Sequence, residues 1–177
     1  MRNMAKIGQF IYPWGNGHYS RMMRLNEKLK ELGDNEFHYF SKGDIYQKLL
    51  DKFPDEKQNI HEVLMPTPID GKFGPSLRKS LWNFLLPVEG NEPLVTQISS
   101  YLKDEGKLYN KIGFDLVIND GDMGSNVLAQ RRNITSLFVT NKLVIFRRCA
   151  NTFEPISPSL ITKSNPILLY SLASSLR

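Results

Sequence analysis

A glycine-rich segment with one histidine and one arginine follows the first apolar run of the sequence. In IYPWGNGHYSR, Gly15 and Gly17 flank Asn16, and His18 and Arg21 follow. Glycines let a backbone approach a ligand closely, and a helix that begins here presents free N–H groups to an anion. A neutral imidazole can also take a proton from an alcohol near neutral pH. The segment therefore predicts a phosphate-binding turn, a catalytic histidine, or a turn that His18 merely caps.

A second polar segment, NDGDMGS, follows the apolar run FDLVI and spans residues 119–125. In an open parallel sheet, ligands bind beyond the carboxyl ends of the strands. A strand parallel to the first would bring Asp120 and Asp122 to the edge that holds His18. Because a carboxylate that fixes the tautomer of an imidazole makes it a better base, we predict His18 and Asp120 as a catalytic pair. The alternative for both aspartates is helix capping and turn formation.

The other small and polar residues of the two segments are predicted to bind an acceptor or a phosphate group: Gly15, Asn16, Gly17, Arg21, Asp122, Gly124 and Ser125. Arg21 lies on roughly the helix face of His18, where a guanidinium can pair with a phosphate or a carboxylate. His38 and His61 lie inside apolar runs, and we expect structural roles for them. Three dispersed histidines and one cysteine give no metal-ligand spacing, so we predict no metal site.

Strand-like and helix-like patterns alternate over most of the chain. The runs AKIGQFIY, EFHYFS, NIHEVLM, FDLVIND and ITSLFVTN read as strands. Between the first two, Met22, Leu25, Leu29 and Leu32 recur at helical spacing. Such alternation predicts right-handed crossovers and a parallel sheet covered on both faces. We therefore expect an α/β, Rossmann-like doubly wound domain over residues 1–141.

Residues 142–177 lack this pattern and are expected to form an atypical tail. They contain three prolines and six serines, and five basic residues against the single acid Glu154. The tail could be a C-terminal arm, an interfacial anchor, or non-native sequence after a shift of reading frame. Most of the net charge of +5 lies here rather than on the predicted domain. A nucleic-acid-binding domain carries its basic surplus as a patch on the folded body, so we predict no nucleic-acid partner.

The remaining composition favours a cytoplasmic protein. The single Cys149 excludes an internal disulfide, and the N-terminus lacks the apolar run of a signal peptide. Peripheral membrane contact is suggested by GKFGPSLRKSLWNFLL, residues 71–86, in which aromatic and leucine side chains stand beside Arg78 and Lys79. The alternative is that this helix packs in the core.

The glycine segment departs from the dinucleotide fingerprint. Ser20 stands where G-x-G-x-x-G/A has its third small residue, and the bulky pair His18 and Tyr19 follows the second glycine. No G-x-x-x-x-G-K-[ST] sequence occurs, so a P-loop is excluded. A nucleotide-cofactor oxidoreductase is therefore a secondary alternative.

Together the motifs resemble the N-terminal half of GT-B glycosyltransferases, close to the UDP-glucuronosyltransferase and MurG groups of archaeal and bacterial proteins. The resemblance rests on G-x-G-H-x-x-R, here Gly15 to Arg21, and on D-L-V-I-x-D, here Asp115 to Asp120. A strand followed by N-K, ITSLFVTNK, completes it. The likeness covers residues 5–141.

The resemblance implies an acceptor-binding domain that faces a second, donor-binding domain across a cleft. His18 would be the base and Asp120 its partner, while in MurG-type members the glycine loop lies near an acceptor diphosphate. The co-substrate would be a nucleotide sugar, the acceptor an alcohol or lipid phosphate, and no cofactor is implied. No donor-binding motif follows Asn141, so we expect a truncated enzyme or one that needs a donor-domain partner. The alternatives are a non-catalytic scaffold subunit of a split enzyme and an inactive fold remnant.

Overall fold

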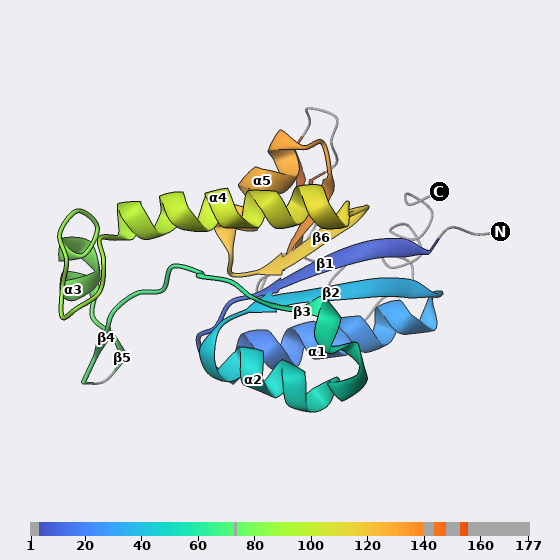
Figure 1. Cartoon of the computed structure of the whole chain (residues 1–177), viewed down its shortest axis with the longest axis horizontal. Helices are drawn as coiled ribbons and strands as arrows, with labels where there is room; N and C mark the ends of the chain where they lie inside the picture. The colour runs from blue at the N-terminus through green and yellow to red at the C-terminus, as the bar shows by residue number, and fades with distance from the viewer. Residues whose placement is uncertain (1–3, 73, 140–143, 148–152, 156–177) are drawn as a thin grey trace.

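The computed structural model describes residues 4–72, 74–139, 144–147 and 153–155, and its centre is a parallel sheet (Figure 1). The five parallel strands are β1 (Ala5–Ile11), β2 (Asn35–Ser41), β3 (Ile60–Glu62), β6 (Leu116–Asp120) and β7 (Thr135–Val139). Their order across the sheet is β3-β2-β1-β6-β7. The chain thus moves outward from β1 to β3 and then crosses back to β6. The strand order reverses between β1 and β6, and the predicted doubly wound α/β sheet is confirmed.

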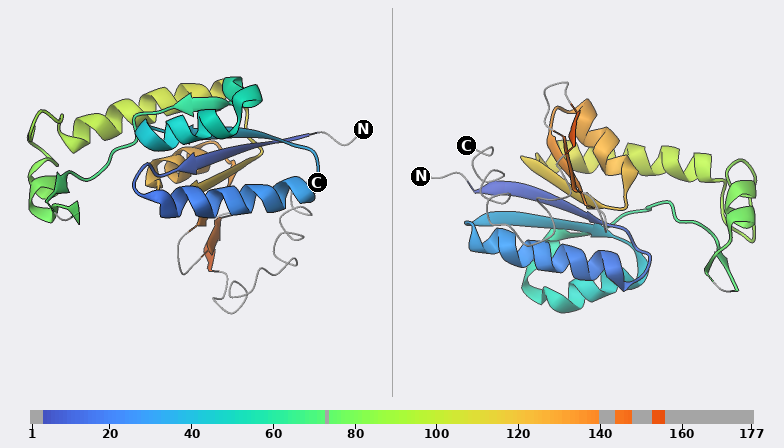
Figure 2. Two further views of the ribbon diagram at one scale, coloured as in Figure 1. Left: turned by 90° about the horizontal axis from the view of Figure 1, so that it is seen from below. Right: turned by 180° about the vertical axis from the view of Figure 1, so that it is seen from behind.

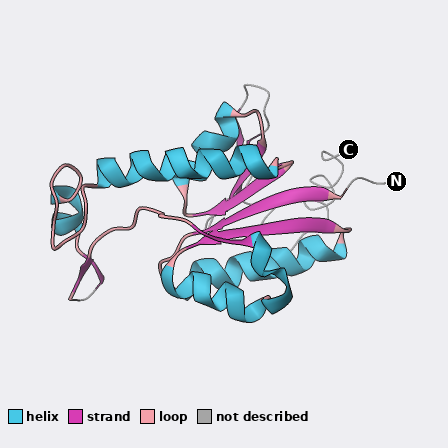
Figure 3. Cartoon of the chain, viewed as in Figure 1, coloured by secondary structure: helices cyan, strands magenta, loops and turns pink. Residues whose placement is uncertain are grey.

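Four helices cover the two faces of the sheet. One face carries α1 (Asn16–Glu31) and α2 (Gly43–Lys52), and the other carries α4 (Leu94–Ile112) and α5 (Met123–Arg131) (Figure 3). A 3-10 helix, Pro54–Asn59, leads into β3. Each face has its own apolar cluster, because successive side chains of a strand point to opposite faces. In β1, Ile7 and Ile11 pack beneath α1 and α2, whereas Phe10 packs with Tyr101 and Tyr109 of α4.

An aromatic cluster ties α4 to the middle of the sheet. The rings of Phe10 and Phe40 stack with centroids 4.2 Å apart, and the Phe114 ring meets both edge-on. Gly8 makes room for this arrangement, since a Cβ atom there would lie 3.2 Å from the Phe114 ring. Phe114 lies two residues before the start of β6, so this packing fixes where β6 enters the sheet.

The chain after β3 leaves the sheet and builds an outlying segment, residues 70–92. It contains the two-residue strands β4 (Asp70–Gly71) and β5 (Gly74–Pro75) and the helix α3 (Leu77–Trp82). In all views this segment lies beyond the N-terminal end of α4, away from the sheet (Figures 1 and 2). Helix α3 buries no residue, and Leu77 and Leu81 are 84% and 74% exposed. The alternative of a core-packed helix is therefore wrong.

Hydrogen bonds attach the outlying segment to the start of α4. Asn83 is buried, and its Nδ2 atom donates to the carbonyl oxygens of Leu86, Asn91 and Glu92. The carbonyl oxygen of Asn83 accepts in turn from the N–H of Leu94, the first residue of α4. One asparagine thus connects the end of α3 to the start of α4. No helix of the described residues is long and apolar enough to cross a membrane.

Two short strands of the predicted tail extend the sheet beyond β7. They are β8 (Val144–Arg147) and β9 (Phe153–Pro155), and both pairings are antiparallel. The expected domain boundary at Asn141 and most of the tail, including Cys149, lie outside the described residues. The choice between arm, anchor and non-native sequence therefore stays a prediction.

Candidate functional site

The carboxyl ends of β1 and β6 lie side by side and position the site. Ile11, the last residue of β1, is paired with Asp120, the last residue of β6. The N–H of Tyr12 then donates to the carbonyl oxygen of Asp120 at 3.1 Å. The β1–α1 turn and the β6–α5 turn therefore begin at the same point. This is the position at which the strand order reverses, where ligands bind in open α/β sheets.

Helix α1 begins without a cap. Gly15, its N-cap residue, has a φ of 73°, a backbone conformation that glycine adopts without strain. Among the described residues no side chain caps the helix, and its first turn holds no acidic residue. Its first N–H groups therefore keep their hydrogen-bonding capacity and the positive end of the helix dipole. Such an end favours an anionic group, and phosphate or acceptor binding at Gly15 and Gly17 stays a prediction.

His18, Arg21 and Asp120 form one hydrogen-bonded cluster. The Nδ1 atom of His18 lies 2.7 Å from Oδ1 of Asp120. Arg21 binds the same carboxylate in a forked manner, with Nε 2.5 Å from Oδ2 and Nη2 2.7 Å from Oδ1. Asp120 is fully buried, while the side chains of His18 and Arg21 remain partly exposed. A buried carboxylate needs such partners, because an unpaired charge in the interior is costly.

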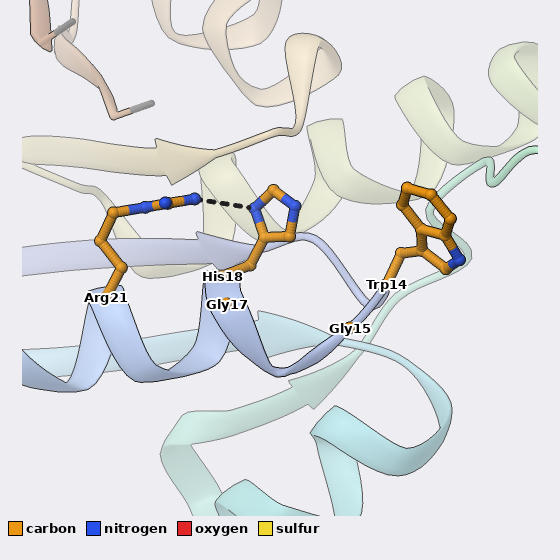
Figure 4. A pocket seen from close by; sticks show the side chains of 5 residues that line it. All are labelled: Trp14, Gly15, Gly17, His18 and Arg21. Carbon is orange, nitrogen blue, oxygen red and sulfur yellow. Dashed lines mark hydrogen bonds between the residues drawn. The ribbon is translucent and has the colours of Figure 1, made fainter. Parts of the chain in front are cut away.

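The contacts of Asp120 decide which nitrogen of His18 carries the proton. An ionised carboxylate only accepts hydrogen bonds, so Nδ1 of His18 must donate to it. The 3.3 Å approach of Arg21 Nη2 to the same nitrogen, drawn in Figure 4, is then a contact between two donors that share one carboxylate. In the neutral ring the proton on Nδ1 leaves the lone pair on Nε2. That nitrogen lies on the side of the ring turned away from Arg21 and can accept a proton.

A pocket of about 270 Å³ opens at this point. It is lined by Trp14, Gly15, Gly17, His18 and Arg21 (Figure 4). Trp14 is 41% exposed, so an indole ring stands free at one side of the pocket. The pocket thus combines an uncapped helix start, a histidine nitrogen with a free lone pair and an open aromatic surface. Asn16 is not among the residues that line it, and its Oδ1 atom accepts from Lys48 Nζ of α2.

Gly121 is a site residue that sequence reasoning missed. Its φ is 88°, and a Cβ atom there would lie 2.9 Å from Tyr12 Cβ and 3.0 Å from His18 Cε1. Only a residue without a side chain allows the β6–α5 turn to pass this close to the imidazole. The signal was present in the sequence as a glycine between Asp120 and Asp122.

Asp122, Gly124 and Ser125 lie at the start of α5 and not in the pocket beside the glycine loop. Asp122 caps α5 by accepting from the N–H groups of Gly124 and Ser125. Ser125 is fully buried, and a Cβ atom on Gly124 would lie 2.5 Å from the Tyr101 ring. None of the three lines the pocket beside His18. Their geometry matches the capping alternative and leaves a binding role for them without support.

A buried group of carboxylates lies behind this turn, and the sequence reading overlooked it. The Tyr101 hydroxyl lies 2.7 Å from an oxygen of Asp122 and 2.7 Å from Oε1 of Glu105. Burial and the nearby Asp122 raise the pKa of Glu105 to about 9. Tyr101, Glu105 and Tyr109 follow one another at four-residue spacing, which places the acid on the buried face of α4. That spacing was the available signal.

The two remaining histidines, His38 of β2 and His61 of β3, form a stacked pair on neighbouring strands. Their ring centroids are 5.5 Å apart, and His38 Nδ1 lies 3.3 Å from His61 Nε2. Burial and the neighbouring His38 lower the pKa of His61 to about 4. Within the described part of the chain, no group of three potential ligands could hold a metal ion.

No protein-family model matches the chain, and no curated protein sequence matches it significantly. Among solved structures, the chain is similar to a UDP-N-acetylglucosamine 2-epimerase. The TM-score is 0.53, with 15% sequence identity over 80% of this chain. The fold is that of the N-terminal part of a GT-B protein. MurG of Acinetobacter baumannii is similar at a TM-score of 0.47 and 13% identity over 77% of this chain.

Each of these similarities covers 34% of the solved protein, so the chain spans about a third of their length. At such low identity the likeness to the epimerase shows the fold alone. It confirms the fold that the glycine and aspartate motifs predicted, and the chemistry has to be argued from the site.

Proposed function

We propose that the chain is the acceptor-binding half of a glycosyltransferase, acting on a nucleotide sugar held by a donor-binding half. The observation that carries this proposal is the 2.7 Å contact between His18 Nδ1 and Oδ1 of the buried Asp120 carboxylate, from which we infer the tautomer of His18. The Nδ1–H of His18 donates to Asp120, and the lone pair of this pocket-lining residue is then left on Nε2. A base in that position suits an acceptor whose hydroxyl must lose a proton.

In the proposed reaction, the acceptor hydroxyl lies against His18 Nε2. Its oxygen forms a bond to the anomeric carbon of the sugar while the bond to the nucleoside diphosphate breaks, and its proton passes to Nε2. The imidazolium that results is stabilised by the buried carboxylate of Asp120, which also fixes the ring. Arg21 holds that carboxylate with two donors and acts as a positioning residue.

The uncapped start of α1 provides the second element of the proposal. Its free N–H groups, with Gly15 and Gly17 beside them, favour a phosphate group of the acceptor or of the departing diphosphate. The forked contact of Arg21 with Asp120 leaves this helix end as the more available anion site. The proposal requires a nucleotide sugar as the donor and an alcohol or a lipid phosphate as the acceptor. It also requires a partner protein that supplies the donor-binding domain.

Measurement of sugar transfer by an assembly that contains both halves tests the proposal. His18→Ala should lower turnover by about 10²- to 10⁴-fold, the usual contribution of a general base. Arg24→Gln, on the exposed face of the same helix, is the matched control and should leave turnover unchanged. Wild-type turnover in the His18→Ala assembly would overturn the catalytic role.

A non-catalytic subunit of a split glycosyltransferase is the second candidate, and the apolar surface of the outlying segment favours it. A subunit that only recruits or anchors its partner would keep full transfer after His18→Ala and lose it after changes in that surface. Binding of NAD(P) by this chain would instead support an oxidoreductase.

Peripheral contact with a membrane surface is the part of the proposal that concerns location. It is supported by the exposed side chains of α3 and the residues after it: Leu77, Leu81, Trp82, Phe84, Leu85 and Leu86. Arg78 and Lys79 stand among them, as in interfacial segments that bind anionic lipid. A lipid-linked acceptor would then be met at the surface in which it resides.

A further inference from the structure

A second and larger pocket lies along the same edge of the sheet. Its volume is about 570 Å³. It opens where β2 and β3 end, since Lys42 directly follows β2 and Thr67 lies in the segment after β3. Its outer wall comes from the base of the outlying segment and the start of α4, with Asn83, Asn91, Glu92 and Gln97.

Lys42 is the single basic residue in the lining of this pocket. Its side chain is half-buried, and Nζ donates to the Thr67 hydroxyl at 3.2 Å. Burial lowers the pKa of this amine. An ammonium has three donors, and among the described residues only the Thr67 hydroxyl takes one. No carboxylate of the described chain compensates its charge, in contrast with Lys79, which pairs with Glu89.

The rest of the lining combines polar residues with the apolar side chains of Leu64, Pro68 and Ile69. It offers the amides of Asn91 and Gln97 and the Thr67 hydroxyl, while the one acid, Glu92, is exposed to solvent. The Nε2 atom of Gln97 donates to the carbonyl oxygen of Glu92, which fixes the wall at the start of α4. The ammonium of Lys42 beside these neutral polar groups suits a ligand that carries one anionic group, while Leu64, Pro68 and Ile69 can contact the apolar part of the same ligand.

Tyr12 links this pocket to the site at His18. Its ring meets the His18 ring edge-on, with centroids 5.6 Å apart, and its hydroxyl donates to the carbonyl oxygen of Pro66 at 3.2 Å. Pro66 precedes Thr67, which touches Lys42. The two pockets are therefore neighbours along one edge, separated by Tyr12 and the segment after β3.

We propose that the Lys42 pocket binds an anionic group, a phosphate or a carboxylate, of an extended acceptor whose hydroxyl reaches His18. The reach toward His18 rests on the proposed function, whereas anion binding at Lys42 does not. Lys42 donates two N–H groups to the anion, and Thr67 and the two amides contact the polar atoms around it. The acceptor is thus an anionic molecule in which charge and reacting hydroxyl lie well apart.

Titration of the ¹⁵N-labelled chain with methyl phosphate, acetate and methyl glucoside tests the inference by NMR. We expect methyl phosphate, acetate or both to shift the backbone signals of Thr67, Asn91 and Gln97. The anion that binds more tightly identifies the phosphate or the carboxylate as the natural group. Lys42→Gln should weaken that binding about tenfold, since a charge-assisted hydrogen bond becomes a neutral one. Lys107→Gln, far along α4, is the matched control and should bind as the wild type does.

Three results would overturn the inference: methyl glucoside alone binding, equal affinity in Lys42→Gln, or anion-induced shifts confined to residues 15–17. The last result would leave the anion site at the start of α1 intact. His18→Ala should bind the anion at Lys42 unchanged. Failure of this pocket and failure of the proposed base are therefore separate outcomes.

Discussion

Replacement of Glu105 by glutamine should stabilise the protein, although Glu105 is 1% exposed and hydrogen-bonded. The Tyr101 hydroxyl has one proton and lies 2.7 Å from oxygens of both Asp122 and Glu105. Asp122 accepts two N–H groups as the cap of α5, and we assign the tyrosine proton to the same carboxylate. The contact with Glu105 is then best satisfied when Glu105 is protonated and donates to the Tyr101 oxygen.

The magnitude follows from the raised pKa of Glu105, about 9 in the folded chain against an ordinary value of 4.5. A raised pKa means that this carboxyl contributes its full stability below pH 4.5 and loses it as the pH rises toward 9. At pH 7 Glu105 keeps its proton in the folded state, whereas in the unfolded state the same carboxyl is ionised, because pH 7 is about 2.5 units above its ordinary pKa of 4.5. At about 1.4 kcal/mol per pH unit, this difference lowers the free energy of unfolding of the wild type by about 3 kcal/mol.

Glu105→Gln removes this cost because glutamine is neutral at every pH. Urea unfolding followed by circular dichroism should show the variant about 3 kcal/mol more stable at pH 7, with a larger gap at pH 8.5. The gap should nearly vanish at pH 4.5. Asp104→Asn, on the exposed side of the same helix, should change stability little at any of these pH values. Parallel pH profiles for wild type and Glu105→Gln would refute the reasoning.

Two further changes test the turn beside His18 and the outlying segment. Gly121→Ala should lower the unfolding free energy by about 1–3 kcal/mol, because its φ of 88° and the contacts with Tyr12 and His18 leave no room for a methyl group. Gly113→Ala, at a φ of 72° with nothing within 4 Å, should cost less in the same urea titration, and an equal cost would contradict the steric argument. Leu81→Gln should release the protein from anionic vesicles in a flotation assay without changing its stability, and unchanged flotation would remove α3 from any membrane contact.

The sequence predicted the sheet and the meeting of His18 with Asp120 because both depend on local patterns and on one rule of topology. Apolar runs of strand length identified β1 and β6, and parallel strands end at a common edge. The register that pairs Ile11 with Asp120 then brings the carboxylate to the start of α1. Arg21 was predicted to bind an acceptor or a phosphate group, and its forked contact with Asp120 was not foreseen from the sequence.

Other features depend on packing that no local pattern reports. The role of Glu105 follows only when α4 is laid on the sheet with Tyr101 against the start of α5. The same residue types cap helices and line phosphate sites, so the sequence could not decide between these two roles for Asp122 and Ser125. The sequence likewise left open whether Leu81 is exposed or packed in the core, since an apolar helix pattern does not say which surface covers it.

The position of the proton on His18 tests the central claim most directly. A long-range ¹H–¹⁵N spectrum of the chain, recorded where His18 is neutral, separates the two tautomers. The account predicts the proton on Nδ1 in the wild type, and a mixture or the reverse tautomer in Asp120→Asn, which removes the negative charge that favours a donor at Nδ1. A proton on Nε2 in the wild type would contradict the account, because His18 would then have no lone pair to offer an acceptor hydroxyl.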